Sequence, residues 1–350
     1  MKKLLLSASA FALLVSCSTS KGPSEIDSNV DYAAKYAATI TEKDLAKHLF
    51  VYASDEFEGR DTGEPGQKKA VKYLKDYYVE QGIASALGGD DYFQEVPAKF
   101  LNKGRRRGAP LKDSENVVAF IKGTEKPDEI VVISAHLDHV GIKGGKIYNG
   151  ADDDGSGTVA LLEIAEAFQK AVKEGKGPKR SILFLHVTGE EKGLLGSKYY
   201  VENPIFPIAN TVVDLNIDMV GRIDDRHKDN PNFVYLIGAD KLSTELHELS
   251  EAMNSKYTNI SLDYKYNDEK DPNRFYYRSD HYNFAKYNVP IIFYFNGTHE
   301  DYHKHTDTPD KINYDLLENR SRLVFHTAWE IANREARLVV DKPVTPPSNK

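Results

Sequence analysis

The stretch "SILFLHVTGEEKGLLGS", residues 181–197, combines an apolar run with a charged turn. The run over 181–187 is typical of a strand that is covered on both faces, as in a parallel sheet. Gly189 ends the run, and Glu190 and Glu191 follow side by side. Two adjacent carboxylates at the end of a strand repel one another unless a cation lies between them. The sequence therefore predicts a strand that ends in a group needing a positive partner.

Other parts of the chain repeat this pattern. Five more apolar runs have the character of buried strands, and they cover residues 115–121, 129–135, 211–218, 232–239 and 289–296. The segment 157–175 is expected to be a helix that packs on a sheet, because Leu161, Ile164, Ala165 and Phe168 have the spacing i, i+3, i+4 and i+7. A similar stripe predicts a helix over 241–254, with Leu242, Leu246, Leu249 and Met253 on one face.

This alternation of strands and helices predicts an α/β fold. The expected architecture is a three-layer α/β/α sandwich around a central, mostly parallel but mixed sheet. Two helices are expected at the start of the domain. Thr41 and Asp44 form a capping pair ahead of the first helix, and Pro65 begins the second, which ends at Gly82. In such folds ligands bind beyond the carboxyl ends of the strands, so functional residues are expected there.

Composition and charge argue against some classes of partner. Of 350 residues, 40% are hydrophobic and 28% are charged, which is ordinary for a globular protein. The formal net charge is −7, and loss of Lys2 and Lys3 with a leader would make it −9. A negative chain is poorly suited to nucleic acid, and the basic triplet at 105–107 is expected to be a solvated turn.

The first residues are expected to be an export signal. Lys2 and Lys3 precede the apolar run 4–15, which is too short to span a bilayer but has the length of a signal-peptide core. The sequence "LLVSC" at 13–17 resembles the bacterial lipoprotein signal, in which cleavage precedes a cysteine that is then lipidated. Cys17 is the only cysteine, so the monomer has no disulfide. An ordinary secretory signal is the alternative.

The expected protein is therefore exported and lipid-anchored in the cell envelope, on the periplasmic or outer-membrane side. Its contact with the membrane is expected to be through this anchor alone, and the oligomeric state is left open. The predicted segments are a lipoprotein signal peptide (1–16), lipidated Cys17 with a polar tether (17–30), a single domain (31–340) and a Pro-rich tail (341–350).

Carboxylates and imidazoles gather at the expected strand ends. They are His136 and Asp138, Asp152, Asp153 and Asp154, Glu190 and Glu191, Asp218, and His299, His303 and His305. Each has an ordinary explanation by itself, such as a helix cap or a solvated turn. Acids that converge at one sheet edge must be protonated or must hold cations, and histidines among them favour zinc over magnesium or calcium. The sequence therefore predicts a zinc site.

The order of these residues, H-x-D, G-A-x-D, E-E, D and H, resembles that of the co-catalytic zinc exopeptidases of the aminopeptidase and glutamate carboxypeptidase type. Glutaminyl cyclases and the transferrin receptor share the fold of that family. The resemblance runs from "SDEFEGRDTGEPG" (54–66) to "YHKHTDTPDKI" (302–312). It implies a zinc exopeptidase-like fold and two Zn²⁺ ions as cofactors.

The resemblance also implies a role for each residue. Asp153 would bridge the two zinc ions; His136 and Asp218 would complete one site, and Glu191 and His303 the other. Asp138 would orient the ligand His136 from behind, and His299 and His305 would be bystanders or pocket wall. The peptide bond between Asp153 and Asp154 is expected to be cis, as in relatives.

Glu190 is then left free beside the water that bridges the two zinc ions. Such water is acidic enough to be hydroxide near neutral pH, and Glu190 would act as general base and acid in peptide hydrolysis. The expected activity is an aminopeptidase for apolar or aromatic N-terminal residues of peptides. The substrate pocket would include Met219, Tyr276, Tyr277, Asp280 and His281, near Phe275, whereas Phe293 and Tyr294 are expected in the core. Arg278 is the only nearby cation that could read a carboxylate, and we expect no such recognition.

Other readings of the same residues remain open. Carboxypeptidase or dipeptidase activity would need only a few different loop residues. An acyltransferase of the glutaminyl cyclase type works with one zinc, which five ligands disfavour. A non-catalytic binding module is disfavoured by the intact ligands together with Glu190.

Overall fold

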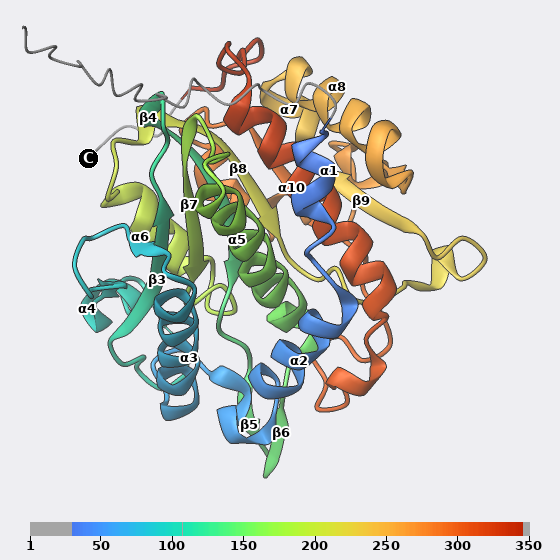
Figure 1. The fold of residues 1–350 in the computed structure, drawn as a ribbon. Helices are drawn as coiled ribbons and strands as arrows, with labels where there is room; N and C mark the ends of the chain where they lie inside the picture. Colours follow the sequence, from blue (N-terminus) through green and yellow to red (C-terminus); the bar gives the residue numbers. More distant parts are fainter. Residues whose placement is uncertain (1–29, 107, 346–350) are drawn as a thin grey trace, which may run out of the picture. The chain divides into compact units, whose positions relative to one another are not determined.

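The apolar runs of the sequence form the strands of one large sheet (Figure 1). The structure is a computed structural model and describes residues 30–106 and 108–345. The predicted signal peptide and lipidated Cys17 lie outside the described residues. Residues 32–106 and 108–345 belong to one compact unit.

The sheet has nine strands in the order β1-β3-β7-β4-β8-β11-β9-β10, with β2 paired to β3. Their bounds are β1 Ala84–Ser85, β2 Phe93–Val96, β3 Ser114–Ile121, β4 Lys126–His136, β7 Arg180–Val187, β8 Thr211–Ile217, β9 Phe233–Ile237, β10 Ser261–Asp263 and β11 Ile291–Phe295. The central strands β7, β4, β8 and β11 are parallel, whereas β3 and β9 run antiparallel to their neighbours β7 and β11. All six predicted strands and the mixed sheet are confirmed. A separate hairpin is formed by β5 Gly141–Lys143 and β6 Lys146–Tyr148.

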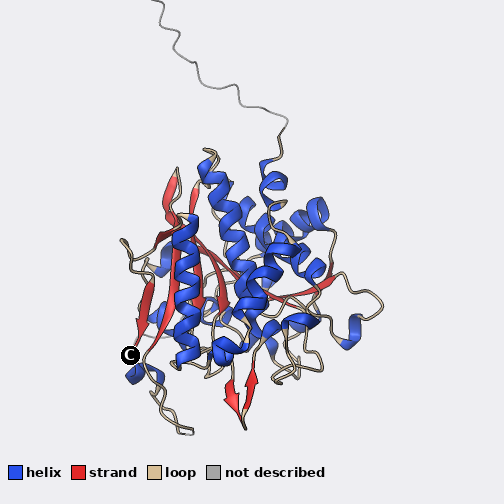
Figure 2. Cartoon of the chain, turned by 60° about the horizontal axis from the view of Figure 1, so that its bottom comes forward, coloured by secondary structure: helices blue, strands red, loops and turns tan. Residues whose placement is uncertain are grey.

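Helices cover both faces of the sheet, which makes three layers (Figure 2). One face carries α1 Tyr32–Ala37, α2 Glu42–Tyr52, α3 Pro65–Gln81, α5 Gly157–Lys173, α8 Thr244–Met253 and α10 Tyr314–Asn333. The other carries α6 Leu195–Glu202, α7 Ala239–Leu242 and α9 His281–Ala285. In β4, Val131 and Ile133 pack toward the first layer and Ile130 and Val132 toward the second, as the period of two in a strand requires.

Shorter helical segments connect these elements. They are α4 Ala98–Leu101, η1 Asp55–Arg60, η2 Ala151–Ser156, η3 Ile208–Asn210, η4 Asp225–His227, η5 Asn254–Thr258, η6 Lys265–Asn267, η7 Phe275–Tyr277 and η8 Pro309–Lys311. η2 leads directly into α5, and η7 precedes α9 in the chain.

The predicted helix ends are confirmed. The Thr41 hydroxyl accepts a hydrogen bond of 3.2 Å from the Asp44 amide at the start of α2. Pro65 is the first residue of α3, and Gly82 ends that helix with φ of 72°, a left-handed conformation that glycine adopts at little cost.

The helix predicted over 241–254 is confirmed over Thr244–Met253 as α8, but its predicted start was wrong. Ser243 takes an extended conformation, and its side chain accepts a hydrogen bond from the Leu246 amide, so it ends α7 and caps α8. The 20-residue helix α10 was not predicted. Its stripe of Leu317, Val324 and Ile331 falls on the core side and could have indicated it.

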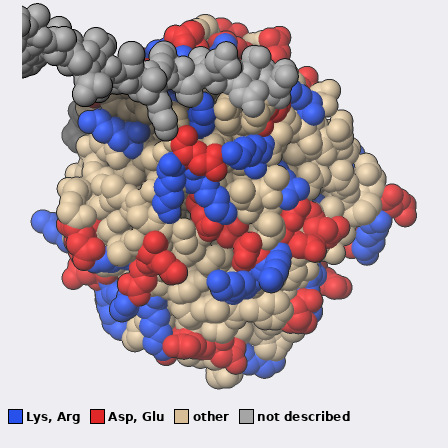
Figure 3. All heavy atoms as spheres, in the orientation of Figure 1, with Lys and Arg blue, Asp and Glu red and all other residues tan. Residues whose placement is uncertain are grey.

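Charged side chains of both signs are interspersed on the face shown in Figure 3, without a broad basic field. Within the described part of the chain, no helix combines the length and the apolar character needed to cross a membrane.

Candidate metal centre

Five chain segments deliver acids and imidazoles to one edge of the sheet. His136 is the last residue of β4, Glu190 and Glu191 follow β7, and Asp218 follows β8 directly. These ends lie side by side because the three strands are parallel neighbours. Asp153 comes from η2 ahead of α5, and His303 from the loop after β11. The structure thus brings together the five residues that the resemblance assigned to metal.

The first group consists of His136, Asp153 and Asp218. His136 Nε2 lies 3.2 Å from Asp153 Oδ1 and 3.6 Å from Asp218 Oδ1. All three side chains are buried. The Ser279 hydroxyl donates a hydrogen bond of 2.6 Å to Asp218 Oδ2, which leaves Oδ1 free to face His136.

The second group lies on the other side of Asp153. His303 Nε2 lies 3.1 Å from Asp153 Oδ2 and 3.3 Å from Glu191 Oε1. Asp153 therefore presents a different oxygen to each group, which is the arrangement of a carboxylate that bridges two ions.

The donor atoms fit zinc. Asp153 Oδ2 and Glu191 Oε1 are buried, and neither has a hydrogen-bond partner among the described residues. A buried carboxylate oxygen without a partner costs free energy that a cation would offset. Imidazole nitrogens with carboxylate oxygens are a ligand set that zinc accepts.

The three consecutive aspartates ahead of α5, Asp152 to Asp154, make different contacts. Asp154 accepts hydrogen bonds from the backbone amides of His136, Gly157 and Met219, and so ties β4, α5 and the end of β8 together. Asp152 accepts from the Gly221 amide at 2.7 Å. The peptide bond between Asp153 and Asp154 is cis, as the resemblance implied. Asp153 alone of the three contributes to the two groups.

Asp138 is placed differently from the expectation. His136 Nδ1 donates to the main-chain oxygen of Asp138 at 3.0 Å, while the nearest carboxylate oxygen of Asp138 is 3.9 Å away. The carboxylate instead accepts hydrogen bonds from the Thr62 hydroxyl at 2.6 Å and from the Glu190 amide at 3.1 Å. Asp138 thus orients His136 through its backbone, and its carboxylate holds the turn that carries Glu190.

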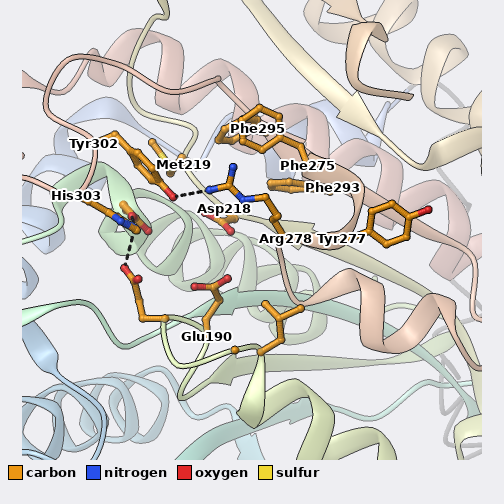
Figure 4. A pocket seen from close by; sticks show the side chains of 14 residues that line it. Glu190, Asp218, Met219, Phe275, Tyr277, Arg278, Phe293, Phe295, Tyr302 and His303 are labelled. Atoms are coloured by element: carbon orange, nitrogen blue, oxygen red, sulfur yellow. Dashed lines mark hydrogen bonds and ion pairs between the residues drawn. The ribbon is translucent and has the colours of Figure 1, made fainter. Parts of the chain in front are cut away.

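Glu190 points into a cavity beside both groups (Figure 4). Burial raises the pKa of its carboxyl well above the usual range; the nearby His136 opposes this shift and Asp218 adds to it. Its neighbour Glu191 instead has a pKa lowered to about 2, because His139 and His303 outweigh burial and the repulsion of Asp153. The two adjacent glutamates therefore differ in environment.

The cavity has a volume of about 300 Å³ and two unlike ends. One end holds the acids and His303. The other is lined by Met219, Phe275, Phe293 and Phe295, which are all buried apart from this opening. Tyr277, Arg278 and Tyr302 also line it, and Arg278 Nη2 donates to the Tyr302 hydroxyl at 3.3 Å (Figure 4).

Part of the predicted substrate pocket is corrected. Met219 and Tyr277 line the cavity, but Tyr276, Asp280 and His281 do not. Asp280 and His281 are fully buried where α9 begins, because this helix turns its first side chains toward the sheet.

The contacts of these two residues are internal. The Ser197 hydroxyl donates to Asp280 at 2.5 Å, and burial raises the pKa of this carboxyl to about 7. His281 Nε2 donates to the Tyr276 carbonyl at 2.9 Å. Phe293, expected only in the core, also forms part of the cavity wall.

Two other histidines near residue 300 stand apart from the two groups. His299 Nε2 lies 3.1 Å from Asp152 Oδ2, and His305 Nε2 accepts a hydrogen bond of 2.8 Å from Lys146. Neither lines the cavity.

Sequence reasoning missed His139. Its ring is fully buried beside Asp153 and Glu191 and forms a group with them that could hold a metal ion. The signal was present in "HLDH" (136–139), where a second histidine follows the first by three residues.

The sequence matches a known protein family. The model of the family described as Peptidase family M28 matches residues 116–328. Leupeptin-inactivating enzyme 1 of Streptomyces exfoliatus is 26% identical over 304 residues, which are 81% of this chain and 59% of that protein. The probable glutamate carboxypeptidase LAMP1 of Arabidopsis thaliana is 38% identical over 105 residues, 30% of this chain and 14% of that protein. The chain thus spans less than two thirds of the length of these relatives.

Solved structures share the fold. An aminopeptidase from Aneurinibacillus sp. strain AM-1 has a TM-score of 0.64 at 17% identity, covering 91% of this chain and 100% of that one. The LapA aminopeptidase of Legionella pneumophila has a TM-score of 0.64 at 21% identity, covering 86% of this chain and 75% of that one.

Proposed function

The chain belongs to peptidase family M28, and we propose that it is a zinc-dependent aminopeptidase that removes N-terminal residues from peptides. The observation that carries the proposal is Asp153, whose two carboxylate oxygens face two separate groups of donors. His136 and Asp218 would hold one ion with it, and Glu191 and His303 the other. Zinc ions bound there would polarise the scissile carbonyl and make a water molecule acidic.

Glu190 is the residue that moves protons in this proposal. Its carboxylate faces the cavity, and its backbone amide is fixed by Asp138 at 3.1 Å. Burial raises the pKa of this carboxyl, which makes its carboxylate form a stronger base for the proton of the attacking water and lets the resulting acid return that proton to the leaving amine. Glu190 would thus be general base and then general acid.

Tyr302 is a donor for the oxygen that becomes negative during the reaction. Its ring stacks on that of His303, with centroids 4.0 Å apart, and its hydroxyl faces the cavity. Burial, aided by the nearby Asp153, raises the pKa of this phenol, so the hydroxyl keeps its proton at neutral pH. A protonated hydroxyl beside the reacting carbonyl can stabilise an oxyanion.

The aromatic end of the cavity supports a preference for an apolar N-terminal residue. Phe275, Phe293, Phe295 and Met219 would enclose one side chain next to the acids. Full burial of a leucine or phenylalanine side chain contributes about 1.5–3 kcal/mol. We expect leucine and phenylalanine substrates to exceed alanine substrates by roughly ten- to a hundredfold in kcat/KM.

The test is hydrolysis of amino-acid p-nitroanilides, of free peptides and of peptides with a blocked amino terminus, each with and without a chelator. We expect cleavage that needs a free amine, that is lost with chelator and that returns with zinc. Cleavage of N-blocked peptides from the carboxyl end would instead identify a carboxypeptidase. Full activity in chelator would refute the zinc assignment.

We also propose that the protein is exported and carries lipid on Cys17, which supports a site of action in the cell envelope. The support is the sequence signal at 13–17. Metabolic labelling with a fatty-acid analogue should mark the wild-type protein and not Cys17→Ala. Equal labelling of both would contradict the anchor without touching the peptidase assignment.

A further inference from the structure

His139 is an imidazole held in place beside the second group of donors. Its ring is fully buried, and neither ring nitrogen has a hydrogen-bond partner among the described residues. The ring lies against Gly150, where an added Cβ would come within 2.5 Å of two ring atoms. Only glycine therefore leaves room for the ring, and the ring has little freedom to turn away.

The nitrogen Nδ1 of His139 faces the same space as the three neighbouring donors. It lies 2.9 Å from Glu191 Oε1 and 3.8 Å from Asp153 Oδ2. His303 Nε2 lies 3.1 Å from Asp153 Oδ2 and 3.3 Å from Glu191 Oε1. These are four of the six edges of a tetrahedron. Zinc bonds of about 2.0–2.1 Å give tetrahedral edges of about 3.3–3.4 Å, which the four distances bracket.

We propose that His139 is a fourth protein ligand of the second zinc ion, bound through Nδ1. The proposal rests on the proposed function, because it assumes that the cluster holds zinc. It adds a residue that the resemblance did not assign. The second site then has two imidazoles and two carboxylates as protein donors, which are ligand types that zinc accepts.

The first site differs. Its protein donors are His136, Asp153 and Asp218, with one imidazole among three ligands. Three protein ligands leave a tetrahedral ion one open position, as catalytic zinc sites require. The two ions are therefore unequal: the second site binds zinc more tightly and fills first, and the first site offers the exchangeable position.

The experiment uses the purified full protein after metal removal. One equivalent of zinc is added, and X-ray absorption at the zinc edge counts the imidazoles around it. We expect two imidazoles in the wild-type protein and one in His139→Ala. In competition with a chromophoric chelator, His139→Ala should lower the affinity of the tighter site by more than roughly a hundredfold and leave the weaker site within a factor of a few.

Two further variants sharpen the test. Asp218→Asn should weaken only the first site, and its single tight zinc should still show two imidazoles. His305→Ala is the matched control, because this histidine contacts Lys146 away from both groups. It should change neither zinc affinity.

The outcomes separate this proposal from the function on which it rests. With two equivalents bound, an average of one imidazole per zinc in the wild-type protein, rather than three for two ions, would overturn the role of His139 whichever site fills first, even if peptidase activity is intact. That measurement needs no variant, so it stands if His139→Ala fails to fold. A wild-type protein that binds no zinc would instead refute the proposed function itself.

Discussion

Glu190 and Glu191 show how two adjacent residues of one type acquire different chemistry. The backbone turn after β7 aims Glu191 at His139 and His303, and it aims Glu190 at the cavity. Contacts with the two histidines lower the pKa of the Glu191 carboxyl, whereas burial raises the pKa of the Glu190 carboxyl. The pair needs no single neutralising partner, because only one of its members faces the imidazoles.

The first residue-scale prediction concerns this pair. Glu190→Gln should keep the bound zinc. Its kcat should fall by roughly a hundred- to ten-thousandfold, because an amide cannot accept the proton. Glu191→Gln is the matched change one residue away, and it should lose zinc from the second site. Elemental analysis and steady-state kinetics measure the two effects. A Glu190→Gln enzyme with normal kcat would remove Glu190 from the mechanism.

A second residue-scale prediction concerns Ser279, whose hydroxyl donates to Asp218 Oδ2 and accepts from the Asn216 amide group. Loss of a hydrogen bond that orients a ligand typically weakens metal binding by roughly ten- to a hundredfold. Ser279→Ala should therefore weaken zinc at the first site only. Ser321→Ala is the control, because this equally buried hydroxyl bonds a carbonyl within α10. Equal weakening of both zinc sites in Ser279→Ala would count against the assignment.

At the scale of elements, α2 offers a test of local folding. The Thr41 hydroxyl caps the helix by accepting from the Asp44 amide. Thr41→Ala should lower the free energy of unfolding by about 1 kcal/mol, within a range of about 0.5–2 kcal/mol. Thr41→Ser keeps the hydroxyl and should lose much less. Urea unfolding measures both, and an equal loss in the two variants would show that the methyl group matters rather than the cap.

The elements that sequence reasoning identified are those with a one-dimensional signal. A continuous apolar run such as 181–187 marks a strand with two covered faces, and the helix caps at Thr41 and Gly82 are short-range patterns. The start of the helix predicted over 241–254 was wrong because Ser243 caps α8, although the apolar stripe in the sequence continues across this residue. The apolar stripe of α10 is interrupted by polar residues such as Arg320. This side chain is buried and donates hydrogen bonds to backbone carbonyls that are distant in the sequence.

The site residues that were predicted correctly are also those with a pattern in the sequence. The five expected ligands came from a pattern of residue order, and the structure gathers them. The directions of Tyr276, Asp280 and His281 depend on how α9 packs against the sheet, which no local pattern encodes. His139 was missed because its contacts with Glu191 and Gly150 join segments that are distant in the sequence.

At the scale of the whole molecule, the layered packing sets the response to acid. His186 lies buried near the carboxyl end of β7, where its Nε2 is 2.7 Å from the Tyr78 hydroxyl and its Nδ1 has no hydrogen-bond partner among the described residues. His281 lies at the start of α9 and stacks on Phe293. Burial lowers the pKa of each imidazole from 6.5 to about 3. Both are therefore neutral in the folded protein at neutral pH.

The unfolded chain has no such burial, so its histidines take up protons below pH 6.5 while the folded protein does not until about pH 3. Between these values the unfolded state binds more protons, and stability must fall as the pH falls. Between pH 8 and pH 5, each of these two histidines should lower the free energy of unfolding by about 2 kcal/mol. Glutamine does not titrate, so the free energy of unfolding of His186→Gln should fall by about 2 kcal/mol less over this pH range than that of the wild type. Urea unfolding in chelator measures the difference without a contribution from zinc release, and His281→Gln provides an independent repeat. Parallel curves for the wild type and His186→Gln would mean that His186 is already protonated, or reaches water, in the folded state.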